Sequence, residues 1–261
     1  PLAGGWLTTV KVTMGFVELA AAVKFVSNID LVYQWGLLTR PAFLAVWFTL
    51  ALVTACYLAG WLRLPNEYGG ERIGWLRQGF AVACFAAAMA CLGGVRGNSL
   101  GTMDAFLPPR SYGQKEGTAV AGELQWELNY EKAVARARAE GKPLFLNFTG
   151  VTCTNCRLME ENMFPRKAVK EELAHFVLAE LFTDKETEES ARYQKLEQEL
   201  YKTVALPYYA VRTADGQRIL EFPGQTWNEQ EFLQFLRKAR EGFAQIRTGT
   251  GEAQVATAVA P

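Results

Sequence analysis

Apolar and polar positions divide the chain into two parts. Long apolar stretches dominate up to about residue 95, whereas residues 123–242 carry charges as densely as an ordinary soluble domain. Three stretches approach or reach the roughly 20 apolar residues that cross a bilayer core, at residues 6–26, 42–62 and 79–95. The pattern therefore predicts a transmembrane region of three α-helices over residues 1–95, followed by a domain in water.

The first of these stretches is interrupted by Lys11, Glu18 and Lys24. A lysine near the end of a span can extend to the headgroups, but an acid near the middle is costly and usually faces a bundle interior or a wet cavity. Glu18 could therefore line a relay cavity. A tilted or interfacial helix, or pairing of Glu18 with Lys11 or with another span, is the simpler interpretation.

Charged residues beside the spans indicate their orientation. Arg63, Arg72 and Arg77 lie between the second and third stretches, whereas Arg40 alone lies in the loop before the second. Because Lys and Arg are more frequent in cytoplasmic loops, residues 63–78 are predicted to be cytoplasmic. Everything after Val95 is then predicted to lie outside the cytoplasm.

The charged part shows alternating helical and strand patterns. Residues 96–122 are rich in Gly and Pro and are predicted to be a linker, residues 123–245 a folded domain, and residues 246–261 a disordered tail. Helical spacing predicts helices at 123–140, 166–174, 186–201 and 228–240, besides one that opens at Arg157. Apolar runs predict strands at 143–148, 176–182, 208–212 and 218–222. This order predicts an α/β domain, a small mixed sheet flanked by helices.

The net charge, the first residue and the cysteines of the chain limit which partners and which chemistry are expected. Lys and Arg total 27, as do Asp and Glu, so the formal charge is zero and no nucleic-acid partner is indicated. The chain begins at Pro1 without an initiator Met or a charged leader, and we expect it to be the C-terminal portion of a longer protein. Of five cysteines, only Cys153 and Cys156 have a redox or metal spacing.

The pair Cys153-Thr-Asn-Cys156 lies between a predicted strand and a predicted helix. Unpaired backbone N–H groups and the helix dipole at a helix N-terminus favour a thiolate, the reactive form of cysteine. Cys56, Cys84 and Cys91 are interpreted as small packing residues between spans. Cys84 and Cys91 are seven residues apart, about two helical turns, which is too far for a disulfide.

Three segments carry a family resemblance: residues 141–150, the run 153–160, and residues 204–209, which contain Leu206-Pro207. Together they resemble the thioredoxin-like domain of DsbD-type transmembrane thiol:disulfide interchange proteins, a cytochrome c biogenesis transmembrane family. The preceding spans, with residues 15–19, resemble the last three spans of that family. The resemblance covers nearly the whole chain apart from the predicted linker and tail.

The resemblance implies roles for individual residues. Cys153 would be the attacking thiolate and Cys156 the resolving thiol of a redox-active disulfide, and Glu160 would tune their protonation. Pro207 matches a cis-proline that faces the cysteine pair, which would let the Leu206 backbone pair with a bound segment.

Two positions depart from the family pattern. Thr152 stands where many thioredoxin-like sites have Trp, and Asn147 stands where the family often has a buried Asp. An amide cannot act as a base, so proton handling is expected to rest on Glu160, water or the substrate.

The implied function is that of a membrane-tethered protein-disulfide reductase. Electrons would come from cytoplasmic thioredoxin, pass through the membrane relay part of the same longer protein, and reduce extracytoplasmic disulfide-bearing proteins by two-step thiol–disulfide exchange. The expected location is the bacterial inner membrane, with the thioredoxin-like domain in the periplasm. No cofactor and no metal site are expected.

Two other interpretations remain open. Residues 150–156, Gly-Val-Thr-Cys-Thr-Asn-Cys, also resemble the cysteine loop of soft-metal modules that bind Cu or Zn. A purely structural cysteine pair in an inactive scaffold is the third interpretation.

Overall fold

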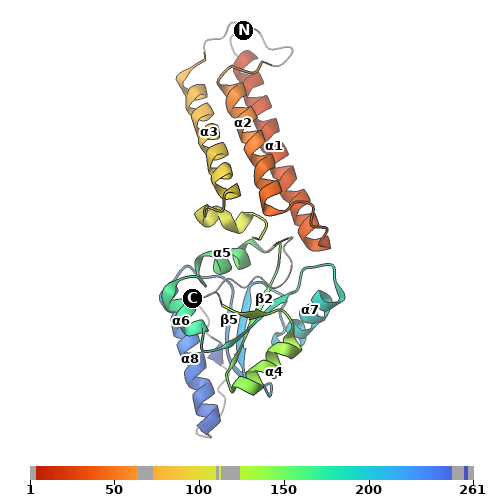
Figure 1. Ribbon diagram of the computed structural model, residues 1–261, viewed down its shortest axis with the longest axis vertical. Coiled ribbons are helices and arrows are strands. Elements are labelled where there is room, and N and C mark those ends of the chain that lie inside the picture. Colours follow the sequence, from red (N-terminus) through yellow and green to blue (C-terminus); the bar gives the residue numbers. More distant parts are fainter. Residues whose placement is uncertain (1–3, 64–72, 110–111, 113–123, 249–255, 258–261) are drawn as a thin grey trace. The chain divides into compact units, whose positions relative to one another are not determined.

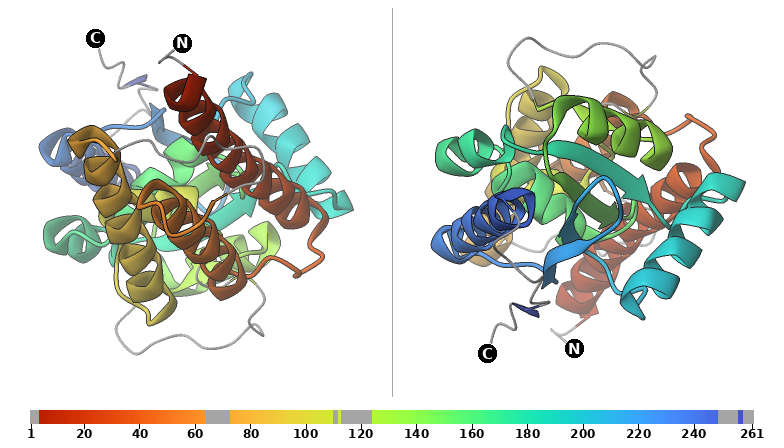
Figure 2. Two further views of the ribbon diagram at one scale, coloured as in Figure 1. Left: turned by 90° about the horizontal axis from the view of Figure 1, so that it is seen from above. Right: turned by 90° about the horizontal axis from the view of Figure 1, so that it is seen from below.

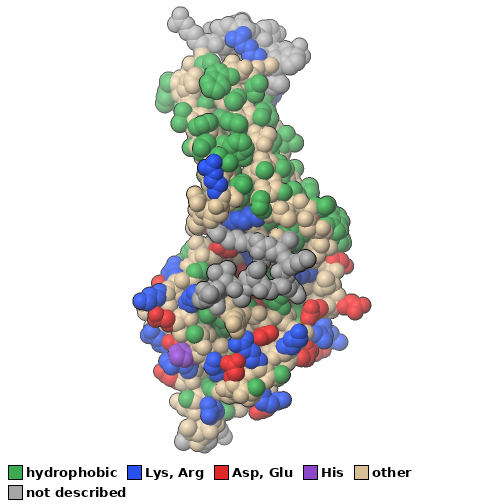
Figure 3. Space-filling view, viewed as in Figure 1, with side chains coloured by type: hydrophobic (Ala, Val, Ile, Leu, Met, Phe, Trp, Pro, Cys, Tyr) green, Lys and Arg blue, Asp and Glu red, His purple; other side chains and the backbone are tan. Residues whose placement is uncertain are grey.

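The computed structural model describes residues 4–63, 73–109, 112, 124–248 and 256–257. The chain forms two compact units, one made of apolar helices and one of mixed α/β structure (Figure 1). Hydrophobic side chains cover the visible face of the helical unit, whereas acidic and basic side chains are spread over the α/β unit (Figure 3). The division follows the change from apolar to charged sequence.

Each predicted span corresponds to a helix: α1 (Gly4–Tyr33), α2 (Arg40–Leu58) and α3 (Trp75–Val95). All three are long and apolar enough to cross a membrane. Their bounds correct the predicted ones. The first helix continues past residue 26, and the third begins before residue 79. The second ends before residue 62 because Gly60, with φ of 79°, follows the end of the helix in a conformation that stops it.

Contacts between α2 and α3 depend on small side chains and on one arginine. A Cβ at Gly94 of α3 would lie 3.1 Å from Leu44 Cδ1 of α2, so glycine permits their close approach. Arg77 donates through Nε to the Leu58 carbonyl at 2.9 Å and through Nη2 to the Tyr57 carbonyl at 2.9 Å. These bonds add side-chain donors to the last carbonyls of α2, among which the Tyr57 carbonyl also accepts a hydrogen bond from Gly60 N at 3.0 Å.

The polar and thiol side chains of this unit occupy distinct places. Cys84 packs beside the cluster of Tyr57 and Leu58, and Cys91 belongs to another apolar cluster. Cys56, Cys84 and Cys91 are free thiols. Glu18 lies on an exposed face of α1. The packing interpretation of the three cysteines stays a prediction.

The predicted linker contains one regular element. A short 3-10 helix, η1 (Gly101–Phe106), corrects the prediction of an irregular segment there. Residues 110–111 and 113–122 of that predicted linker lie outside the described residues, as does Arg72 of the loop between α2 and α3.

The α/β unit is built on one mixed sheet, with strand order β1-β3-β2-β4-β5-β6 among the described residues. The strands are β1 (Trp126–Glu127), β2 (Leu144–Thr149), β3 (Val177–Phe182), β4 (Tyr208–Arg212), β5 (Arg218–Pro223) and β6 (Ala256–Thr257). β2 runs parallel to β3 and antiparallel to β4, and β4 pairs antiparallel with β5. The predicted mixed sheet is confirmed.

Helices cover both faces of the sheet (Figure 2). They are α4 (Tyr130–Glu140), α5 (Thr154–Asn162), α6 (Lys167–Leu173), α7 (Glu188–Tyr201) and α8 (Glu229–Thr248). Side chains of α5, α6 and α8 share a core with Phe145 and Tyr209, whereas α4 and α7 share one with Leu146 and Phe148 on the other face. Alternate residues of β2 therefore point to different helices.

Two boundaries of this unit differ from the prediction. The predicted helix at 123–140 begins only at Tyr130, where the Asn129 side chain accepts a hydrogen bond from Lys132 N at 3.0 Å, and β1 precedes it. The predicted tail is wrong at its start, because α8 continues to Thr248 and its apolar face still packs on the core through Phe243 and Ile246. Residues 249–255 and 258–261 of that tail lie outside the described residues.

Candidate active site

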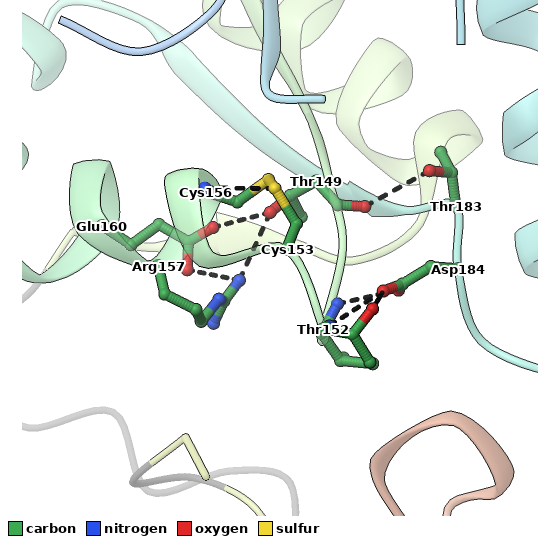
Figure 4. Close-up of a disulfide and its surroundings, with 9 residues drawn as sticks. Thr149, Thr152, Cys153, Cys156, Arg157, Glu160, Thr183 and Asp184 are labelled. Carbon is green, nitrogen blue, oxygen red and sulfur yellow. Dashed lines mark hydrogen bonds and ion pairs between the residues drawn. A yellow bond between two sulfur atoms is a disulfide. The ribbon is translucent and has the colours of Figure 1, made fainter. Parts of the chain in front are cut away.

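The cysteine pair lies where β2 passes into α5 (Figure 4). β2 is buried along its whole length, and residues 150–152, here called the approach loop, connect it to Cys153. Cys153 is the N-cap of α5, and its Sγ accepts a hydrogen bond from Cys156 N at 3.2 Å. This places the first sulfur at the positive end of the helix dipole, as the sequence predicts.

The two cysteines differ in exposure. They form a disulfide with a Cα–Cα distance of 5.3 Å, and Cys153 is half-buried while Cys156 is 0% exposed. A partner disulfide can therefore approach the Cys153 sulfur but not that of Cys156. This asymmetry is what an attacking thiolate and a resolving thiol require.

Leu206 and Pro207 lie beside the approach loop. The peptide bond between them is cis, and the Pro207 carbonyl accepts a hydrogen bond from Gly224 N at 2.8 Å. A Cβ built on Gly150 would lie 3.1 Å from Leu206 Cδ1 and 2.7 Å from Asp184 Oδ2. Glycine at position 150 therefore allows three segments, distant in sequence, to meet at one place.

Glu160 lies on α5 in a polar cluster beneath the disulfide (Figure 4). One carboxylate oxygen accepts a hydrogen bond from Thr149 Oγ1 at 2.7 Å, and the other forms an ion pair with Arg157. Burial raises the pKa of Glu160 to about 8, although Arg157 lowers it, and the nearby Glu180 charge raises it further. The carboxyl group can therefore hold or release a proton near neutral pH.

A row of three side chains on adjacent strands lies on the same face as α5. Asn147 of β2 is opposite Glu180 of β3 and opposite Tyr209 of β4. Tyr209 belongs to the core that α5 shares, and its hydroxyl has no hydrogen-bond partner among the described residues. Burial raises the pKa of Glu180 and of Tyr209. We call Glu180, Asn147 and Tyr209 the polar row.

Asp184 holds the approach loop from the other side. It follows β3, and its carboxylate accepts hydrogen bonds from Val151 N at 2.7 Å, Thr152 N at 2.9 Å and Thr152 Oγ1 at 2.8 Å. Thr152 thus has a hydrogen-bonding role.

Sequence reasoning missed Glu180, Asp184 and Tyr209. The available signal was the single acid within the apolar run 176–182, because a charge in a buried strand needs a partner. For Asp184 there was no comparable signal, since a polar residue after a strand is ordinary. The structure leaves His175 exposed just after the end of α6.

Removing the Asp184 carboxylate is expected to loosen the approach loop. Asp184→Ala breaks three hydrogen bonds to a charged acceptor and should lower the free energy of unfolding by about 2–3 kcal/mol, whereas Thr152→Val should cost about 1 kcal/mol. Urea unfolding of the full chain in detergent, read by pulse proteolysis, measures both. Asp215→Ala is the control, because its side chain is 86% exposed in a surface ion pair. Equal losses for Asp184→Ala and Asp215→Ala would contradict this role.

Comparisons with known proteins agree with this geometry. Residues 130–240 match the thioredoxin-like domain family. The thiol:disulfide interchange protein DsbD of Ralstonia nicotianae is 27% identical over 188 residues, which cover 68% of this chain and 28% of that protein. The protein of the same name from Pseudoalteromonas atlantica is 25% identical over 196 residues, covering 75% of this chain and 30% of its own length.

A solved thioredoxin structure from Thermus thermophilus is 25% identical and covers 49% of this chain and 90% of its own, with a TM-score of 0.38. The chain spans less than a third of the length of the curated relatives named above. Within that span the resemblance read from the sequence is confirmed. The chain carries a thioredoxin-like domain after three apolar helices, and it is a homologue, over about 70% of its length, of the thiol:disulfide interchange proteins named DsbD.

Proposed function

We propose that this chain is a thiol:disulfide oxidoreductase that works as a membrane-tethered protein-disulfide reductase. The observation that carries the proposal is the asymmetry of the cysteine pair: a half-buried sulfur at a helix N-terminus and a fully buried one behind it. This pair belongs to a thioredoxin-like domain, and DsbD proteins are its homologues. Disulfide exchange needs no bound cofactor.

The expected mechanism has two exchange steps. The Cys153 thiolate attacks a partner disulfide, forms a mixed disulfide and releases one partner thiolate, which takes a proton from water. Cys156 then gives up its proton and attacks the Cys153 sulfur, which releases the second partner thiolate. The partner disulfide has gained two electrons, and Cys153–Cys156 has become the disulfide seen here.

The electron source and the compartment are further parts of the proposal. Three helices of membrane-spanning length precede the domain, with Arg63 after the end of α2 and Arg77 in the first turn of α3. The positive-inside tendency then favours a periplasmic thioredoxin-like domain in a bacterial inner membrane. Cytoplasmic thioredoxin would supply electrons through the membrane relay part of the same longer protein, and disulfide-bearing proteins outside the cytoplasm would accept them.

Single-turnover reduction of a test disulfide examines the proposed chemistry. The full chain in detergent, with Cys56, Cys84 and Cys91 replaced by serine, is reduced and mixed with a disulfide-bonded peptide. We expect one equivalent of peptide to be reduced as Cys153–Cys156 forms, and no reaction with Cys153→Ser. Cu(I) titration is the companion measurement. Copper binding that needs both cysteines, without any exchange, would favour the soft-metal alternative instead.

A further inference from the structure

The two buried acids near the cysteine pair come from different elements but share one face of the sheet. Glu160 projects from α5, and Glu180 lies in the polar row opposite Asn147. Phe182 follows Glu180 by two residues in β3, so both side chains point to the same face. The Arg157 guanidinium lies 5.8 Å from the centroid of the Phe182 ring while it forms the ion pair with Glu160. Arg157 therefore contacts Glu160 directly, and its charge also acts on Glu180.

Three charged or titratable groups among the described residues face these acids. They are Arg157 of α5, Tyr209 of β4, and Lys185, whose Nζ lies 3.8 Å from the centroid of the Phe182 ring. Burial raises the pKa of both carboxyls, while Arg157 favours the ionised form of each. Two buried carboxyls near one another do not both ionise readily, so ionisation of one favours the protonated form of the other.

Cys156 is placed to exchange a proton with this pair. Cys156 and Glu160 are four residues apart in α5 and therefore lie on the same side of the helix. Cys156 is 0% exposed, so bulk water does not reach its thiol directly. At position 147 a buried acid would stand in the same row, but an amide occupies it.

We propose that Glu180 is a positioning residue for proton transfer. Together with Glu160 it forms a carboxyl pair, and this pair accepts the proton of Cys156. The pair thereby does what an acid at position 147 could do and the amide of Asn147 cannot. This inference rests on the proposed function. In the resolving step the Cys156 S–H bond breaks, and its proton goes to the pair. The new thiolate forms the bond to Cys153 Sγ, and the bond from Cys153 to the partner sulfur breaks. The departing partner thiolate takes up a proton as the pair gives up the one received from Cys156, which restores the pair.

The test measures the resolving step separately from the first attack. Glu180→Gln leaves only the Glu160 carboxyl, paired with Arg157. Without the nearby Glu180 charge, the Glu160 carboxylate is a weaker base. In rapid-quench single turnovers of the full chain with a disulfide peptide, decay of the mixed disulfide at pH 7 should slow about tenfold, and the midpoint of its pH–rate profile should move to lower pH. In a Cys156→Ala background, formation of the mixed disulfide should change less than twofold.

Two further variants distinguish proton handling from a structural effect. Asn147→Asp combined with Glu180→Gln returns an acid to the polar row and should restore most of the rate. Glu199→Gln, on the exposed side of α7, should change nothing. An unchanged rate and pH profile in Glu180→Gln, or no rescue by Asn147→Asp, would overturn the inference. If the unmodified chain reduces no peptide at all, the proposed function itself fails.

Discussion

Replacing Cys156 with alanine is expected to stop turnover and leave Cys153 joined to its partner protein. The first attack needs only the accessible sulfur at the N-terminus of α5, which this variant keeps. Release needs the buried second thiol, whose attack is intramolecular and therefore far faster than attack by a free thiol. Multiple-turnover disulfide reduction should fall at least about a thousandfold, while a mixed disulfide accumulates.

Mass spectrometry of alkylated membranes identifies the captured proteins and the cysteine that holds them. Cys84→Ala is a suitable control, because that thiol packs in the apolar helical unit and should affect neither turnover nor capture. Capture through Cys153 of proteins with disulfides exposed outside the cytoplasm would name the electron acceptors. A Cys156→Ala variant that still turns over at the normal rate would contradict the two-step mechanism.

Replacing Glu197 with glutamine is expected to stabilise the thioredoxin-like domain at alkaline pH. Glu197 of α7 is 0% exposed, neither carboxylate oxygen has a hydrogen-bond partner among the described residues, and burial raises its pKa from 4.5 to about 8. A raised carboxyl pKa means that the fold favours the protonated form. Its contribution to stability is therefore full below pH 4.5, declines as pH rises to about 8, and then levels off.

Each pH unit in that window costs about 1.4 kcal/mol, so the parent should lose on the order of 3–5 kcal/mol through this group. Glu197→Gln should be close to the parent near pH 4 and clearly more stable near pH 8.5. Urea unfolding read by pulse proteolysis measures the free energy of unfolding of both proteins across this pH range. Groups other than Glu197 titrate in both proteins, so their contributions cancel in the difference between the two. Glu199→Gln, exposed two residues later, should follow the parent throughout. Parallel curves for Glu197→Gln and the parent would show that Glu197 does not titrate as inferred.

Local patterns predict the elements of this fold well where an apolar run is bounded by turn residues. The run 143–148 and the strand at 208–212 correspond closely to β2 and β4, because continuous apolar sequence between turn residues has few other buried solutions. Helix ends are less predictable. α1 continues to Tyr33 and α8 to Thr248, since packing of their later turns outweighs weak local preferences.

The candidate site could be predicted only as far as local sequence describes it. Cys153 and Cys156 carry their own spacing, and Pro207 was found through a resemblance. Glu180 enters the site only because the strand pairing places it opposite Asn147, thirty-three residues away in sequence. Such long-range register is not encoded in any short segment, so the sequence could mark Glu180 as a buried acid but could not place it beside the cysteine pair.

The burial difference between the two sulfurs separates two tasks within one small domain. In the proposed mechanism partners contact the half-buried Cys153 beside Leu206, whereas protons are handled by the buried acids between the sheet and α5. Substitutions around the first group can change which proteins are accepted and leave the acid–base chemistry intact. Related proteins can therefore evolve to reduce different substrate proteins while the residues that handle protons stay the same.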